Sequence, residues 1–210
     1  LYSPLMRVNT NGWNRLRYTL YAPFYDLIAR RLGRGRRRAI ELLHVRAGER
    51  VLIVGCGTGL DLELLPRNAQ VTAVDLTPAM VEKTRARAER LGMSIDARVM
   101  DAAALDFDEA SFDCVILHLI LAVVPDPYAT AREAARVLQA GGRASIFDKF
   151  LPDERDPSFG RRMVNVLTNV FATEINRRLG EILGGTDLRV VTNEASVFGG
   201  AFRVVMAAKA

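Results

Sequence analysis

A short apolar strand that runs directly into a glycine-rich turn constrains the fold more than any other feature. Val51–Val54 is followed by GCGTG at residues 55–59, and a helical pattern begins at Leu60. Glycines here permit a tight turn and let the backbone approach a ligand at the start of the helix. The dinucleotide fingerprint G-x-G-x-x-G requires glycine where Leu60 stands. The turn therefore predicts a bound ligand and favours one other than NAD.

Two carboxylates end the next two predicted strands. Asp75 comes twenty residues after Gly55, at the end of Val71–Val74, where it could accept hydrogen bonds from both hydroxyls of a ribose. Asp101 ends the strand Ala97–Met100, where it could accept a hydrogen bond from an adenine amino group. The structural alternatives are a helix-capping acid at Asp75 and a turn residue at Asp101. Together the acids favour an adenosine-containing ligand.

Short β-branched runs alternate with helical patterns from residue 50 onward. The expected strands are Val51–Val54, Val71–Val74, Ala97–Met100, Phe112–Leu117, Arg143–Phe147, Leu188–Thr192 and Ala201–Ala207. The expected helices are Leu60–Leu65, Pro78–Leu91, Asp126–Leu138 and Phe159–Leu183, with cap residues Thr77 and Asp126 before proline in two of them. This order predicts an α/β fold, a doubly wound and mostly parallel seven-stranded sheet whose last two strands form an antiparallel edge.

The first 46 residues have a different character. Apolar side chains recur at spacings of three and four between Trp13 and Leu32, and Pro23 predicts a break in this helical region. Residues 1–50 hold 11 Arg against three acids, whereas the whole chain of 210 residues carries a formal charge of +5. We therefore expect residues 1–46 to form basic amphipathic helices, as a lid or a membrane contact, and residues 47–210 to form the α/β domain.

The cysteines and histidines indicate neither a disulfide framework nor a metal site. Cys56 falls in the glycine turn and Cys114 in a predicted buried strand, and His44 lies far along the chain from His118. The apolar run from Cys114 to Pro125 is too short to cross a bilayer. We expect a cytoplasmic protein, with peripheral contact to the inner face of an anionic membrane as a further expectation.

These segments together resemble the successive motifs of class I S-adenosylmethionine-dependent methyltransferases. The likeness covers about residues 45–150 and rests on VLIVGCGTG at 51–59, VDLTPAM at 74–80, DA at 101–102 and SFD at 111–113. In that family the glycine loop holds the methionine part of the cofactor, the two acids hold ribose and adenine, and the residue after the first acid packs on adenine. The resemblance implies S-adenosyl-L-methionine as the cofactor. The residues implied to bind it are Tyr21, Tyr25, Gly55, Cys56, Gly57, Thr58, Gly59, Asp75, Leu76, Met80, Asp101, Ala102 and His118.

Two further points qualify the resemblance. The family often carries an acid two places before the first glycine, where this chain has Ile53, so support of the methionine end by that side chain is lost. The segment YAPFYD at 21–26 is similar to one in bacterial methyltransferases acting on phospholipids and quinones, in which the N-terminal helices close over the cofactor. This places Tyr18, Tyr21 and Tyr25 at the cofactor or acceptor mouth, and the alternative is that they pack their helix on the sheet.

Methyl transfer from a sulfonium is an in-line displacement, which needs positioning and exclusion of water more than a dedicated nucleophile. A base is needed only if the acceptor arrives protonated or must lose a proton. The predicted catalytic residues are Asp148 and His118, after the fifth and fourth strands, and Tyr25. Asp148 could also stabilise an ammonium acceptor. The alternative for His118 is a satisfied core residue or a wall of the cofactor site.

The acceptor is predicted from the N-terminal region. A basic amphipathic helix with Trp13 at its start can lie in an anionic interface, so the leading prediction is a phospholipid amine, with phosphatidylethanolamine-type N-methylation at the membrane surface. The alternative is C- or O-methylation of a quinone precursor or another small hydrophobic molecule. RNA methylation or nucleic-acid binding is less favoured, because the basic excess is confined to one end and few aromatics are arranged for base stacking.

Overall fold

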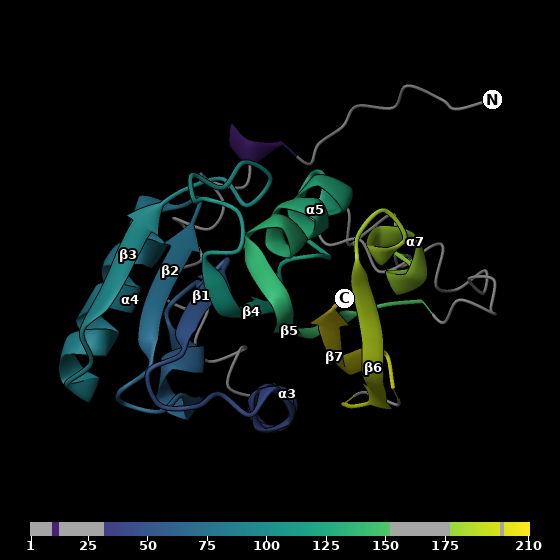
Figure 1. Cartoon of the computed structure of the whole chain (residues 1–210). Coiled ribbons are helices and arrows are strands. Elements are labelled where there is room, and N and C mark those ends of the chain that lie inside the picture. The colour runs from purple at the N-terminus through teal and green to yellow at the C-terminus, as the bar shows by residue number, and fades with distance from the viewer. Residues whose placement is uncertain (1–9, 13–31, 152–176, 198–199) are drawn as a thin grey trace.

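A seven-stranded sheet with the strand order β3-β2-β1-β4-β5-β7-β6 forms the centre of the protein (Figure 1). The computed structural model describes residues 10–12, 32–151, 177–197 and 200–210. The strands are β1 (Arg50–Val54), β2 (Gln70–Asp75), β3 (Ile95–Val99), β4 (Phe112–His118), β5 (Leu138–Lys149), β6 (Leu188–Ala195) and β7 (Phe202–Lys209). β7 is antiparallel to both β5 and β6, while the other pairs are parallel. This confirms the predicted α/β sheet and its antiparallel edge.

Helices cover both faces of the sheet and divide the core in two. α3 (Gly33–Leu43) and α4 (Pro78–Leu91) pack with β1 on one face, through residues such as Leu43. α5 (Pro127–Val137) and α7 (Leu179–Leu183) pack on the other face. The central strands β1 and β4 are mostly apolar, and nearly all of their residues are buried. α3 therefore belongs to the core of the α/β domain, although its sequence lies in the basic first 46 residues.

Several element boundaries differ from the predicted ones. β3 begins two residues earlier and ends at Val99, and the next residue, Met100, instead donates its N–H to the carbonyl of Asp75. β5 begins at Leu138, because α5 ends at Val137 and the backbone becomes extended at once. The helix predicted after the glycine turn is a short 3-10 helix, η1 (Leu60–Leu64).

Of the two predicted helix caps, the one at Asp126 forms and the one at Thr77 does not. Asp126 caps α5 by accepting the N–H of Ala129 at 2.9 Å, whereas the Thr77 side chain makes no capping hydrogen bond in α4. Of the predicted helix Phe159–Leu183, residues 159–176 lie outside the described residues, and α7 covers its end. Of the helical region predicted between Trp13 and Leu32, residues 13–31 lie outside them as well. In the described part of the chain, no helix is long and apolar enough to cross a membrane.

Candidate cofactor site

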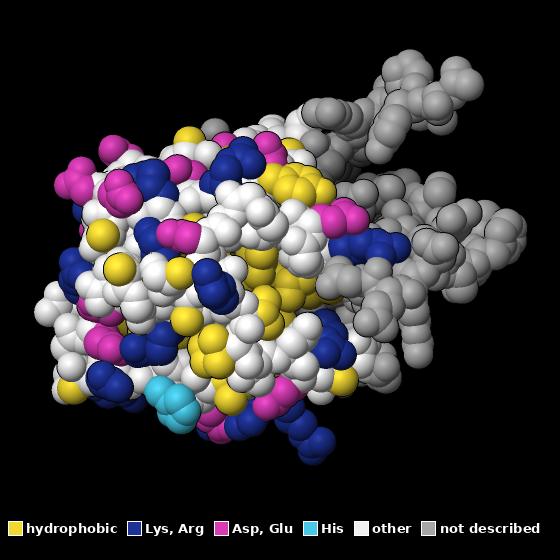
Figure 2. Space-filling model, turned by 45° about the vertical axis from the view of Figure 1, so that its right-hand side comes forward, with side chains coloured by type: hydrophobic (Ala, Val, Ile, Leu, Met, Phe, Trp, Pro, Cys, Tyr) yellow, Lys and Arg dark blue, Asp and Glu magenta, His cyan; other side chains and the backbone are white. Residues whose placement is uncertain are grey.

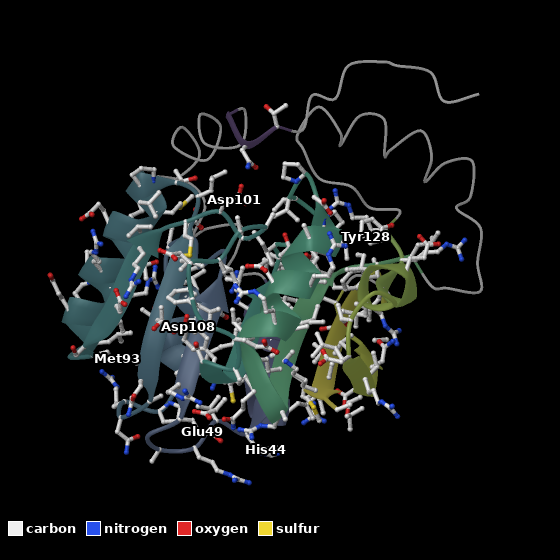
Figure 3. The ribbon with its side chains drawn as sticks, turned by 45° about the horizontal axis from the view of Figure 1, so that its top comes forward. His44, Glu49, Met93, Asp101, Asp108 and Tyr128 are labelled. Atoms are coloured by element: carbon white, nitrogen blue, oxygen red, sulfur yellow. The ribbon has the colours of Figure 1, made fainter. Side chains whose placement is uncertain are left out.

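A pocket opens at the carboxyl ends of β1 to β4, which is the edge where open α/β sheets bind ligands. Seven of the predicted cofactor residues line it, namely Gly55, Gly57, Asp75, Leu76, Met80, Asp101 and Ala102. Figure 3 shows Asp101 at this edge beside the short segment that contains Asn11, whereas His44 and Glu49 lie at the opposite end of the strands. The structure thus brings the glycine turn and both acids together.

The glycine turn requires glycine for two physical reasons. Gly55, Gly57 and Gly59 have φ values of 71°, 56° and 78°, which residues with a side chain rarely adopt. A Cβ on Gly55 would also lie 2.5 Å from Cδ1 of Ile120. The turn folds back on the end of β2, since the N–H groups of Gly55 and Cys56 both donate to the carbonyl of Val74. A ligand can therefore meet bare backbone at this point.

α4 holds the glycine turn from behind. Thr84 donates its hydroxyl to the carbonyl of Gly57 at 2.9 Å, and Arg87 donates Nε to the carbonyl of Thr58 at 2.8 Å. Cys56 and Thr58 are buried there, and burial raises the pKa of the Cys56 thiol. Cys56, Thr58 and Gly59 are absent from the lining of the pocket. These three residues were predicted to bind the cofactor, and what the structure shows of them is that they shape the turn.

Asp75 shows how a carboxylate can serve the loop and a ligand together. One oxygen accepts the N–H of Gly57 and the other that of Thr77, both at 2.9 Å. The side chain of Thr77 also hydrogen-bonds to this carboxylate. A carboxylate has about four lone-pair positions, so at least one stays open for a further hydrogen bond. Burial raises the pKa of Asp75, and the N–H groups of Thr77 and Gly57 lower it by less than burial raises it.

Asp101 has a partner that sequence reasoning missed. It accepts the N–H of Ala103 at 2.9 Å and the side-chain amide of Asn11 at 2.6 Å. Asn11 lines the same pocket, although it stands 90 residues earlier in the chain. No local pattern around Asn11 signals this contact.

The residues after β4 form an apolar wall on the other side of the pocket. Leu119, Ile120, Val123, Val124 and Pro125 line it. They belong to the apolar run that ends at Pro125, whose first part was predicted as a strand. The signal for the wall was present, because the run continues well past the length that the strand needs.

His118 lies in the interior rather than in the pocket lining. Its side chain is 1% exposed, with Nδ1 2.9 Å from the carboxylate of Asp61 and Nε2 2.9 Å from the hydroxyl of Ser145. Arg36 donates Nη1 to the other oxygen of Asp61 at 2.7 Å. Burial alone would raise the pKa of Asp61, but the interactions with Arg36 and His118 outweigh it and hold that pKa below its usual range. This geometry matches the alternative of a satisfied core histidine.

Asp148 is also separated from the pocket. It is fully buried and accepts the N–H of Ala122 at 2.9 Å and its neighbour Lys149's N–H at 2.8 Å. The predicted direct contact with an acceptor therefore has no counterpart in the pocket lining. Tyr18, Tyr21 and Tyr25 lie outside the described residues. Among those that are described, no group of three or more His, Cys, Asp or Glu side chains could hold a metal ion.

The fold and the pocket define a class of protein, the doubly wound α/β domains with a ligand site after the first glycine turn. The fold matches a solved methyltransferase, the geranyl diphosphate C-methyltransferase of Streptomyces coelicolor A3(2), with a TM-score of 0.72 and 18% identity. That match covers 86% of this chain and 82% of the other. The architecture is therefore that of the Rossmann-like methyltransferases.

Sequence comparison narrows the class. Residues 52–146 match a family model described as a methyltransferase domain. A phosphatidylethanolamine N-methyltransferase of Cereibacter sphaeroides is 38% identical over 121 residues, which cover 57% of this chain and 59% of that protein. A ubiquinone biosynthesis O-methyltransferase of Xanthomonas axonopodis pv. citri is 44% identical over 99 residues, 46% of this chain and 41% of that protein. The chain spans about half the length of these relatives, and the likeness is to their methyltransferase domain.

Proposed function

We propose that this protein transfers the methyl group of S-adenosyl-L-methionine to a hydrophobic acceptor, and that the acceptor is a phospholipid amine of the phosphatidylethanolamine type. One observation carries the proposal, a pocket with two unlike sides. Asp75 and Asp101 follow adjacent strands beside the glycine turn, while residues 119–125 form an apolar wall facing them. The polar side suits the cofactor and the apolar wall suits the acceptor.

The residues present fit this cofactor. The glycine turn leaves backbone to meet its methionine part. Asp75 retains a lone-pair position for the ribose, and Asp101 retains positions for the adenine amine. Leu76 and Met80 supply apolar contact beside them. When bound, the cofactor supplies an electrophilic methyl group on a sulfonium. Asp75 and Asp101 are the only ionisable side chains in the described lining of the pocket, so Tyr25 remains the proposed acceptor-side residue.

Calorimetry with S-adenosylhomocysteine tests the cofactor assignment. We expect Asp75→Ala to weaken binding by about 10- to 100-fold, because hydrogen bonds to a charged group contribute about 1.5–3 kcal/mol. Asp96→Ala is the matched control, since it removes the same charge from an exposed ion pair with Arg98 on β3. Equal affinity in the Asp75→Ala variant and the wild type would remove the ribose role from Asp75.

Two considerations support a phospholipid acceptor over a quinone precursor. The relative from Cereibacter sphaeroides, which is named phosphatidylethanolamine N-methyltransferase, matches this chain over 121 residues, whereas the quinone-related relative matches it over 99. The arginine-rich N-terminal region also suits an anionic surface. The relative from Xanthomonas favours the alternative, O-methylation of a quinone precursor. Nucleic acid is less favoured. On the described face in Figure 2, basic and acidic side chains are interspersed, and hydrophobic ones gather in its middle.

Transfer of labelled methyl groups distinguishes the two acceptors. The protein is incubated with labelled S-adenosylmethionine and either vesicles of phosphatidylethanolamine with anionic lipid or a soluble demethyl-quinone precursor. Label in the ethanolamine lipid supports the proposal, and we then expect peripheral association with the inner face of the membrane. Label confined to the quinone precursor establishes the alternative, and no label in either contradicts both.

A further inference from the structure

We infer that Asp148 and Arg177 are positioning residues that together hold the pocket wall, residues 119–125, in the shape that meets the methyl acceptor. The part of this inference that concerns the acceptor rests on the proposed function. The part that concerns the wall rests on hydrogen bonds alone.

The wall needs support from outside itself. It follows β4 directly, and its first residue, Leu119, has a φ of 60°, a conformation that costs free energy in a residue with a side chain. The N–H groups of Val123 and Val124 donate to the carbonyl of Ile120, and the N–H of Leu119 donates to the carbonyl of Phe147 on β5 at 2.8 Å. Strained backbone of this kind persists where surrounding contacts determine it.

Asp148 supplies one such contact from the interior. Its carboxylate is fully buried and accepts the N–H of Ala122, which is itself fully buried in the middle of the wall. Without Asp148, that N–H group would be left in the interior without this acceptor, which is unfavourable. The Lys149 N–H on the other oxygen fixes the direction in which the carboxylate points.

Arg177 supplies the second contact. Its guanidinium donates Nη1 to the carbonyl of Leu121 and Nη2, at 2.8 Å, to the carbonyl of Val124. Two carbonyls three residues apart are thereby bound by one planar group, a geometry that the single ammonium of lysine does not reproduce. Donors from Arg177 and an acceptor from Asp148 therefore act on the backbone of three residues of the wall, Leu121, Ala122 and Val124.

The two residues are also linked to one another. The N–H of Leu151, just past β5, donates to the carbonyl of Arg177 at 2.9 Å, which fixes Arg177 beside the strand that carries Asp148. Burial raises the pKa of Asp148, and the positive charge of Arg177 is among the influences that oppose this rise. The backbone contact with Leu151 thus holds Arg177 next to the end of β5 that carries Asp148, while each side chain binds the wall.

The wall is placed where a small displacement affects the reaction. Ile120 packs against Gly55 so closely that a Cβ there would overlap it, so the wall meets the glycine turn. Asp75 accepts hydrogen bonds from Gly57 and Thr77, and Asp101 accepts them from Ala103 and Asn11, all outside the wall. Loosening the wall should therefore impair the acceptor's alignment more than cofactor binding, and a misplacement of about 1 Å can cost about 100-fold in rate.

The test compares Arg177→Gln and Asp148→Asn with the wild type, and uses Arg178→Gln as the control. The neighbouring Arg178 reaches Glu181 at 3.8 Å, so its replacement removes the same charge beside the same strand. Hydrogen exchange of the peptide spanning residues 119–125 is measured with S-adenosylhomocysteine bound, together with the Kd of that ligand. Where the wild type methylates phosphatidylethanolamine vesicles or the quinone precursor, kcat and KM are measured with that acceptor.

We expect exchange in the wall to rise about tenfold or more in both variants, with the ligand Kd changed by less than about threefold. The value of kcat/KM for the acceptor should fall about 10- to 100-fold, and Arg177→Lys should recover part of it. Unchanged exchange in both variants, or faster exchange with unchanged turnover, overturns the inference. If hydrogen exchange in a variant becomes faster throughout the sheet, the substitution has destabilised the whole fold. The milder variant Arg177→Lys then tests whether Arg177 holds the wall. If the wild type methylates neither acceptor, the proposed function fails, and exchange alone decides whether the two residues hold the wall.

Discussion

Asp61 is a buried carboxylate whose effect on stability depends on its partners, Arg36 and His118. It is buried between Arg36 and His118, and His118 in turn reaches Ser145, so the network joins α3, η1, β4 and β5. Every member is buried. A buried charge that loses its partner is strongly unfavourable, whereas the intact pair contributes little beyond an apolar replacement.

The first prediction concerns the stability of this network. We expect Asp61→Asn to lower the free energy of unfolding by about 3–5 kcal/mol, because it removes the charged carboxylate that pairs with the buried guanidinium of Arg36. Urea denaturation measures the change, and Asp96→Asn, in an exposed pair with Arg98, should change it by at most about 1 kcal/mol. The double variant Arg36→Met with Asp61→Leu should regain part of the loss. If Asp61→Asn lowers the free energy of unfolding no more than the control does, Arg36 and Asp61 do not form a buried ion pair.

The second prediction is the pH dependence of the same contribution. The pKa of Asp61 is lower in the folded protein than the value of about 4 in the unfolded chain. The contribution of Asp61 is therefore fully present above about pH 4 and is lost as the pH falls through the folded pKa. The difference in unfolding free energy between wild type and Asp61→Asn should be smaller at pH 3 than at pH 5. A difference that grows on acidification would mean that the sign of the shift is wrong.

At the scale of elements, the close approach of α3 to the sheet decides whether Arg36 on α3 can reach Asp61 in η1. A Cβ on Gly35 would lie 2.3 Å from the ring of Phe147, which is fully buried and has no room to move. Glycine at this position lets α3 come near enough for Arg36 to reach Asp61. The same helix carries a second glycine, Gly33, whose Cβ would meet no atom within 4 Å.

The third prediction uses this pair of glycines. Gly35→Ala should destabilise the protein by about 1–3 kcal/mol through overpacking against Phe147, despite the better helix propensity of alanine. Gly33→Ala, in the same helix, should stabilise it by up to about 1 kcal/mol. Thermal unfolding of both variants measures the contrast. Equal effects of the two substitutions would show that α3 is not held against β5 as described.

At the scale of the whole molecule, the uneven charge leads to the fourth prediction. Arg15→Glu with Arg17→Glu lowers the formal charge from +5 to +1, and we expect it to abolish most of the pelleting with anionic vesicles. Arg67→Glu with Arg90→Glu makes the same change away from the N-terminal region. Vesicle pelleting at low and high salt is compared for both variants. Equal loss in the two would mean that net charge, rather than the N-terminal helical region, governs binding.

The fold and the polar half of the site were largely predictable. The period of apolar residues, the glycine turn and the acids after β2 and β3 are local patterns, and parallel strands must present their carboxyl ends at one edge. Gly55, Asp75 and Asp101 therefore could be assigned to one pocket before any coordinates. The exact starts of β3 and β5 were not predictable, because pairing with neighbouring strands sets them.

The sequence by itself determined the order of strands and helices, the glycine turn and the two acids of the pocket, since each depends on residues close together in the chain. Only the tertiary structure decided what the buried polar groups do. Asp61 meets His118 57 residues away, Ala122 meets Asp148 26 residues away, and Asn11 meets Asp101 across 90 residues. The physical reason is that a buried donor or acceptor must find a partner, and that partner is set by which elements the fold packs together.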